Sequence, residues 1–150
     1  MNVIEAGPEH LDQLAPLFDG YRAFYRQAPD IEGARRFVSA RLTRGDSKVF
    51  LALDDEGTAL GFVQMFPSFS SVSMKDLWIL NDLFVAPEGR RQGVGRALMD
   101  RARQLALDTG AKGLVLETEA DNHTAKRLYE ELGWELDGSH HYALPTSDER

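Results

Sequence analysis

The chain of 150 residues contains no cysteine. This absence excludes a disulfide framework, a thiolate zinc site and a cysteine nucleophile, and it is consistent with a reducing compartment. The first residues, MNVIEAGPEH, lack the basic and apolar regions of a signal peptide. We therefore expect a cytoplasmic protein.

Long apolar runs and positive charge are also scarce. No apolar run approaches the roughly 18 to 20 residues that a membrane-spanning helix needs, so we expect no membrane partner. Lysine and arginine number 17 against 24 aspartate and glutamate residues, for a net charge of −7. An acidic surface repels nucleic acid and attracts cations such as amines or basic peptides, although such a charge can also serve solubility alone. The composition favours an amine partner over nucleic acid.

The apolar pattern predicts a mixed α/β fold in a single domain over residues 1–150, with a loose tail at 145–150. The first helix is expected to break or kink at Pro16 and Gly20. Asp30 is expected to cap the start of the second helix, which Gly45 ends. The elements are, in order, a strand at 2–6, two helices up to 45, a hairpin at 48–67, a strand at 74–86, a helix at 93–109, a strand at 113–118, a helix capped by Asp121 or Asn122, and closing strands at 134–136 and 140–144.

The stretch PEGRRQGVGRAL, residues 87–98, joins the long strand to the following helix. It fits neither the nucleoside-triphosphate loop, because Val94 stands where a glycine is needed, nor the dinucleotide fingerprint, whose third glycine is replaced by Leu98. Read as Arg-x-x-Gly-x-Gly from Arg90, it can still bind an anion through backbone N–H groups and the start of the helix. The alternative is a glycine-rich turn with solvated arginines.

Two motifs in this order resemble the GCN5-related N-acetyltransferase (GNAT) superfamily. The first is Arg-x-x-Gly-x-Gly at 90–95, and the second comprises Asn122, Ala125, Tyr129 and Gly133-Trp134. The resemblance extends over residues 77–134. It implies a mixed sheet of six to seven strands in which the fourth and fifth splay apart near a bulge at 81–83, with about four helices.

The resemblance also implies acetyl-coenzyme A as the acetyl donor, bound along the splayed strand and at the helix start. Backbone groups of the turn would hold the pyrophosphate, those of the fourth strand would pair with the pantetheine arm, and Arg96 and Lys126 would reach the phosphates of the nucleotide. The implied binding residues are Leu83, Phe84, Val85, Arg90, Arg91, Gln92, Gly93, Val94, Gly95, Arg96, Asn122 and Lys126.

The expected reaction is direct attack of a primary amine on the acetyl thioester. The ammonium must first lose a proton, and the leaving thiolate needs a proton donor. The resemblance implies Tyr129 as the general acid, although its helical stripe would equally place it in the core. Asp82, or alternatively Glu117, is the candidate base; both could instead be structural. Asn81 stands where the family has glutamate, which argues against a two-acid arrangement.

Acceptor selectivity in this family comes from the first two helices and their connection. Tyr21, Tyr25 and Asp30 are the candidate acceptor residues, as an aromatic and acidic pocket for a cation. The expected acceptors are diamines, polyamines or basic peptides; the alternatives are an amino acid, an aminoglycoside, a protein N-terminus, or a non-catalytic acyl-coenzyme A sensor. We expect no metal site, and the resemblance implies a homodimer, with the segment at 140–144 pairing across it.

Overall fold

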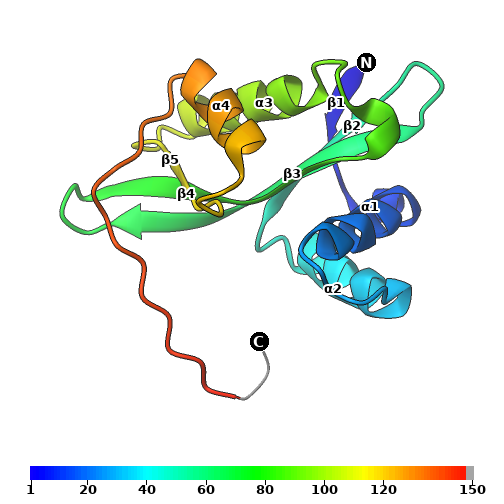
Figure 1. Ribbon diagram of the computed structural model, residues 1–150, viewed down its shortest axis with the longest axis horizontal. Coiled ribbons are helices and arrows are strands. Elements are labelled where there is room, and N and C mark those ends of the chain that lie inside the picture. Colours follow the sequence, from blue (N-terminus) through cyan, green and yellow to red (C-terminus); the bar gives the residue numbers. More distant parts are fainter. Residues whose placement is uncertain (148–150) are drawn as a thin grey trace. The chain divides into compact units, whose positions relative to one another are not determined.

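The computed structural model describes residues 1–147, which form two compact units (Figure 1). The first unit is Met1–Glu117, and the second begins at Thr118. The first unit contains β1 (Asn2–Glu5), η1 (Pro8–His10), α1 (Leu11–Phe24), α2 (Ile31–Arg44), β2 (Lys48–Leu53), β3 (Ala59–Ser70), β4 (Lys75–Val85), η2 (Pro87–Gly89), α3 (Val94–Asp108) and β5 (Leu114–Leu116). The second contains α4 (His123–Glu131).

The sheet has the strand order β1-β2-β3-β4-β5. The first four strands pair antiparallel, and β5 pairs parallel to β4 after the α3 crossover. A parallel neighbour requires such a long connection, because the chain must return to the other end of the sheet. The predicted α/β class and the crossover after β4 are confirmed.

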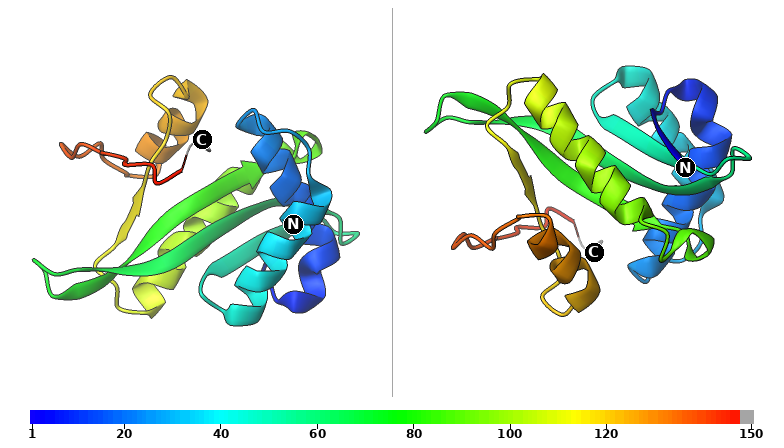
Figure 2. Two further views of the ribbon diagram at one scale, coloured as in Figure 1. Left: turned by 90° about the horizontal axis from the view of Figure 1, so that it is seen from below. Right: turned by 90° about the horizontal axis from the view of Figure 1, so that it is seen from above.

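Helices α1 and α2 cover one face of the sheet (Figure 2). Strand side chains alternate between faces, so this face receives every second residue. Its core consists of Leu14, Leu17, Phe18, Ala34, Val38, Val49, Leu51, Phe62 and Ala86, with Tyr21 and Phe84 packed against it. This layer therefore positions α1 directly over β3 and the end of β4.

Helix α3 covers the opposite face (Figure 2). Its apolar stripe buries Val94, Leu98, Met99, Ala102, Leu105 and Ala106. The Arg101 guanidinium lies 4.2 Å from the centroid of the Phe50 ring, a cation–π contact from this helix to β2. The burial of Val94 in the first turn fixes the start of α3 against the sheet.

Helix α1 is continuous, so the predicted break at Pro16 and Gly20 is wrong. Proline costs one backbone hydrogen bond, and the burial of its neighbours Leu14, Ala15, Leu17 and Phe18 offsets that loss. At Gly20 a Cβ atom would come within 3.3 Å of the Phe84 ring. The glycine therefore permits close packing of helix on strand rather than ending the helix.

The sheet has five strands rather than six or seven, because 134–136 and 140–144 are not strands in the described part of the chain. Both segments are short, and a strand forms only where a neighbour takes its backbone hydrogen bonds. The predicted caps Asp30, Gly45 and Asn122 are confirmed. None of the helices formed by residues 1–147 has the length and apolarity to cross a bilayer.

Candidate active site

The pairing of strand β4 with its neighbouring strands changes at Asn81. On the β3 side, Gln64 pairs with Asp82 and Met65 with Leu80, which leaves Asn81 as the extra residue of a bulge. On the β5 side, Trp78–Leu80 pairs with Leu114–Leu116, and the pairing does not extend to the residues of β4 after the bulge. The bulge and the parting of β4 from β5 therefore coincide, as the resemblance implied.

The last residues of β4 turn backbone groups toward the edge that β5 has left. The N–H of Ala86 donates to Leu60 O on the β3 side at 2.8 Å. Because direction alternates along a strand, the N–H and C=O groups of Leu83 and Val85 face the opposite, open side. The Arg90 Nε donates to Val85 O there at 3.3 Å, while the other groups can receive an extended ligand.

Asp82, directly after the bulge, is a buried carboxyl group with 3% of its surface exposed. Gln64 Nε2 donates to its Oδ2, and Asn81 Nδ2 donates to its Oδ1 at 2.9 Å. Burial raises the pKa of Asp82, while the hydrogen bonds with Gln64, Tyr21 and Asn81 oppose that rise. A carboxylate with a raised pKa holds a proton more firmly, which is what a general base requires.

Tyr21 brings the predicted acceptor region to this carboxyl group. It extends from α1, and its hydroxyl forms a side-chain hydrogen bond with Asp82 and lies 3.4 Å from Asn81 O. Its ring packs on Phe62 and Phe84, with a centroid separation of 5.8 Å to Phe62. Tyr25 lies edge-on to Tyr21 at 5.1 Å. Two of the three predicted acceptor residues thus lie together, one of them at Asp82.

Asp30, the third predicted acceptor residue, has a structural role. Its Oδ1 accepts from the Gly33 N–H at 2.9 Å and caps α2, and its own N–H donates to Asp19 Oδ1. Glu117, the alternative base, directly follows β5 and is exposed. Burial and the hydrogen-bond network therefore favour Asp82 over Glu117.

The turn at 90–93 leads into the start of α3 with no side-chain cap. Gly93 has φ 77°, Arg91 has φ 64°, and a Cβ atom on Gly93 would have no neighbour within 4 Å. The Ala97 N–H donates to Gly93 O as the first bond of the helix, so the N–H groups of Val94 and Gly95 precede the hydrogen-bond ladder of the helix. Backbone N–H groups at such a helix start suit a phosphate group.

The remaining turn residues lie at the surface. Arg90, Arg91, Gln92 and Arg96 are exposed, and Gln92 Nε2 donates to Glu88 O at 2.7 Å. Leu83, Phe84 and Val85 are half-buried on β4. Exposed arginines beside the backbone N–H groups of a helix start suit a pyrophosphate.

The second unit contains three of the predicted residues. Asn122 Oδ1 accepts from the Ala125 N–H at 3.3 Å and caps α4, and Lys126 Nζ donates to Ala120 O at 3.2 Å. Tyr129 lies with its ring centroid 6.1 Å from that of Trp134. The stripe of α4 thus presents Tyr129 beside the tryptophan of the second motif.

Gln64 is a functional candidate that the sequence reasoning did not include. It lies in the apolar run GFVQMF and is 7% exposed. A polar side chain within a buried strand needs a partner, and that requirement was the available signal.

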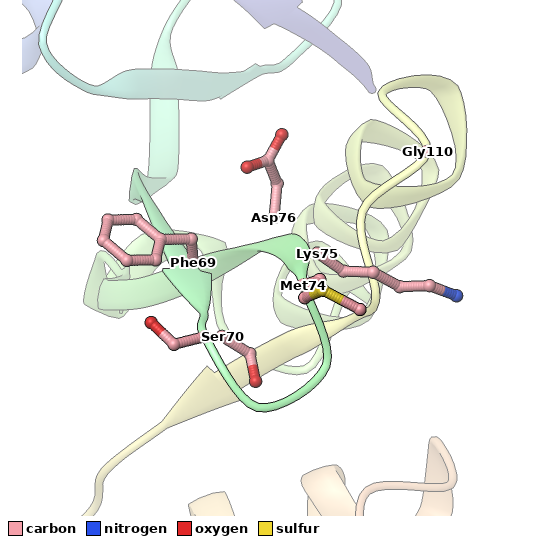
Figure 3. A pocket seen from close by; sticks show the side chains of 7 residues that line it. Phe69, Ser70, Met74, Lys75, Asp76 and Gly110 are labelled. Atoms are coloured by element: carbon pink, nitrogen blue, oxygen red, sulfur yellow. The ribbon is translucent and has the colours of Figure 1, made fainter.

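A surface hollow of about 590 Å³ lies at the tip of the β3–β4 hairpin, away from the bulge. Figure 3 shows Phe69 and Lys75 extending from the tip in opposite directions. The lining of this hollow contains none of the predicted site residues. Among residues 1–147, no group of three or more His, Asp or Glu side chains is arranged to hold a metal ion.

The acetyltransferase (GNAT) family model matches residues 14–134. This chain belongs to the GNAT family. YhfO, an uncharacterized N-acetyltransferase of Bacillus subtilis (strain 168), is 47% identical over 145 residues, which cover 96% of this chain and 97% of that protein. The crystal structure of a probable acetyltransferase matches with a TM-score of 0.94 and 46% identity, and covers 99% of this chain and 100% of that one.

An aminoglycoside N-acetyltransferase in complex with CoA shares the GNAT fold, with a TM-score of 0.81 and 18% identity over 97% of this chain and 95% of that one. The chain is thus a GNAT N-acetyltransferase, and this family uses acetyl-CoA. The open β4 edge and the uncapped start of α3 are the features of this chain that fit such a donor.

Proposed function

We propose that this enzyme transfers an acetyl group from acetyl-CoA to a primary amine by direct attack, with Asp82 accepting the amine proton. The observation that supports this proposal best is the buried carboxyl group beside the strand bulge, hydrogen-bonded to Tyr21 of the acceptor helix. An ammonium has no free lone pair, so removal of its proton must precede attack. Asp82 is the buried acid placed for this step.

Tyr21 connects Asp82 to the acceptor side. Because Asp82 is almost fully buried, an amine reaches it through a relay rather than by direct contact. The Tyr21 hydroxyl can pass a proton to the carboxylate and accept one from the amine, since a hydroxyl both donates and accepts. The faces of Tyr21 and Tyr25 add attraction for the cation before it loses its proton.

The donor would be held by groups of β4, the 90–93 turn and α3. Acetyl-CoA supplies an activated thioester with a thiolate leaving group. The N–H groups at the start of α3 bind its pyrophosphate, and the side chains of Arg90, Arg91 and Arg96 add positive charge beside it. Leu83 and Val85 pair with the extended arm, and an N–H near Leu83 or Phe84 stabilises the developing charge on the carbonyl oxygen.

Tyr129 is the proposed general acid for the leaving sulfur. Its phenol can donate a proton that the solvent replaces, and its position on α4 follows the family motif. Asn122 and Lys126 belong to the same proposal as contacts to the donor. A Tyr129→Phe variant is expected to lose turnover but retain donor affinity.

The proposed acceptor is a small diamine or polyamine, or the amine of a basic peptide. The net charge of −7 and the aromatic pair Tyr21 and Tyr25 support a cationic acceptor. An amino acid, an aminoglycoside or a protein N-terminus would use the same chemistry at the same carboxylate. These acceptors differ in the charge near the amine, which a substrate panel can resolve.

The test measures free thiol release from acetyl-CoA with polyamines, amino acids, aminoglycosides and basic peptides. Turnover with cationic amines, reduced roughly 10²- to 10⁴-fold in Asp82→Asn, is the expected result. Asp76→Asn, an exposed aspartate on the same strand, is the matched control and should retain full rate. Tight donor binding without turnover for any amine would instead indicate an acyl-CoA sensor.

A further inference from the structure

Gln64 and Ser47 form a chain of hydrogen bonds that ends on Asp82. Ser47 Oγ donates to Gln64 Oε1 at 2.8 Å, and Gln64 Nε2 donates to Asp82 Oδ2. Ser47 directly precedes β2, Gln64 lies on β3 and Asp82 lies on β4. The two hydrogen bonds therefore link the residue before β2 to the two neighbouring strands. Gln64 and Asp82 are also direct cross-strand partners.

The direction of the amide determines which form of the carboxyl group it stabilises. A carboxylate only accepts hydrogen bonds, so an amide nitrogen facing it stabilises the charged form. The opposite amide orientation would present an oxygen, which pairs only with a protonated acid. In the arrangement found, the Ser47 hydroxyl donates to Oε1 and holds the amide with Nε2 facing the carboxylate.

We infer that Gln64, oriented by Ser47, is a positioning residue that keeps the Asp82 carboxylate ionised and turned toward Tyr21. Gln64 and Asn81 each hold one oxygen of Asp82 by an amide hydrogen, so the carboxyl group cannot rotate freely. The hydrogen bonds that oppose the effect of burial on this carboxyl group come from Gln64, Tyr21 and Asn81, and of these three side chains Tyr21 is the ionisable one. The inference gains its catalytic meaning from the proposed role of Asp82 as base.

The enzyme provides a matched pair of glutamines for the test. Gln104 Nε2 also donates to an aspartate, Asp108 Oδ1, at 2.7 Å, but on the exposed surface of α3. Replacing either glutamine by methionine removes the same donor at similar volume. Only Gln64→Met removes it from a buried carboxylate, where a lost hydrogen bond matters most.

The experiment measures the pKa of Asp82 by carbon-13 NMR and the pH dependence of kcat/KM with one fixed amine. Gln64→Met is expected to raise the Asp82 pKa by roughly one unit and to move the ascending limb of kcat/KM upward by a similar amount. Gln104→Met should change neither. An unchanged Asp82 pKa in folded Gln64→Met protein would overturn the inference.

Two further results separate this inference from the proposed function. If the Asp82 pKa rises but the rate profile stays fixed, Gln64 holds the carboxylate as inferred and Asp82 is not the base. If Gln64→Met does not fold, Ser47→Ala should give a smaller rise of the same sign, and Ser47→Thr should restore the original value. A rise that threonine fails to reverse would count against the orienting role of Ser47.

Discussion

The two halves of β4 have the same strand geometry and different surroundings. Before the bulge, Trp78–Leu80 pairs on both sides, with β3 and β5. After it, Asp82, Leu83, Phe84 and Val85 pair with β3 alone. The first half is thus paired along both edges, while the second half has one row of backbone groups that β5 does not pair with.

One inserted residue accounts for this division. A bulge adds a residue to one strand, bends it and re-aims the side chains that follow. Here the bulge coincides with the end of the pairing with β5 at Leu80, and the next residue, Asp82, lies opposite Gln64 and forms hydrogen bonds with Tyr21 and Asn81. The open edge of β4 and the candidate base therefore meet at the same bulge.

Deletion of Asn81 should have the largest effect. It removes the unpaired residue while Gln64 keeps Asp82, and Met65 keeps Leu80, as cross-strand partners. We expect the variant to fold and kcat/KM to fall at least about 10²-fold, because small misplacements of reacting groups cost that much. Circular dichroism measures folding, and thiol release measures turnover. Near-normal turnover would mean that catalysis does not depend on the bulge.

Gly93→Ala should weaken donor binding more than it weakens the fold. The residue has φ 77°, where an L side chain costs roughly 1–2 kcal/mol, and its Cβ would project into open space beside the start of α3. We expect a KM for acetyl-CoA raised about tenfold and a loss of stability of about 1 kcal/mol. Gly45→Ala, also at positive φ but at the end of α2, is the control for strain alone. A KM raised equally by both variants would contradict a direct role of Gly93.

The pH dependence of stability should reveal the buried Asp82. Its pKa is raised in the folded state by burial, so its stabilising contribution is complete at acid pH, below the pKa of an unfolded aspartate. That contribution is lost as the pH rises through the raised folded value, because the folded state then releases a proton that it binds better than the unfolded chain does. We therefore expect the free energy of unfolding of the wild type, relative to Asp82→Asn, to fall over this interval. Urea titrations across the acid range measure this difference in the free energy of unfolding. A difference that rises with pH would contradict a raised pKa of Asp82 in the folded state.

Sequence patterns predicted the first unit well, because its signals are local. Asp30 and Gly45 bound α2 through cap chemistry, and the spacing of apolar residues on α3 matches its buried face. The predicted break at Gly20 failed because the reason for this glycine is the Phe84 ring, far away in the sequence. The closing strands failed because alternating residues do not reveal which backbone will pair with them.

The candidate site divides in the same way. The turn at 90–95 could be predicted because its glycines and the start of a helix are visible in the sequence. Gln64 became a candidate only through the strand register, which places it opposite Asp82. Asp30 shows the converse, since its cap role and its predicted acceptor role use the same carboxylate. Local sequence signals indicated the candidate donor-binding turn, but tertiary pairing was needed to find the surroundings of the candidate base.

Arg90→Ala should have the smallest effect and tests whether the open half of β4 depends on the arginine side chain that contacts it. Arg90 is exposed, and its Nε donates to Val85 O at 3.3 Å. Exposed charges contribute little, so we expect a change in stability within about 0.5 kcal/mol and a KM for acetyl-CoA raised roughly two- to fivefold with kcat unchanged. Arg103→Ala, an exposed arginine further along α3, should leave KM unchanged. The rise in KM should shrink at high salt, because screening weakens the wild-type contact as well. A fall in kcat would instead mean that Arg90 shapes the reacting end of the strand, and the two halves of β4 would then differ by more than their pairing.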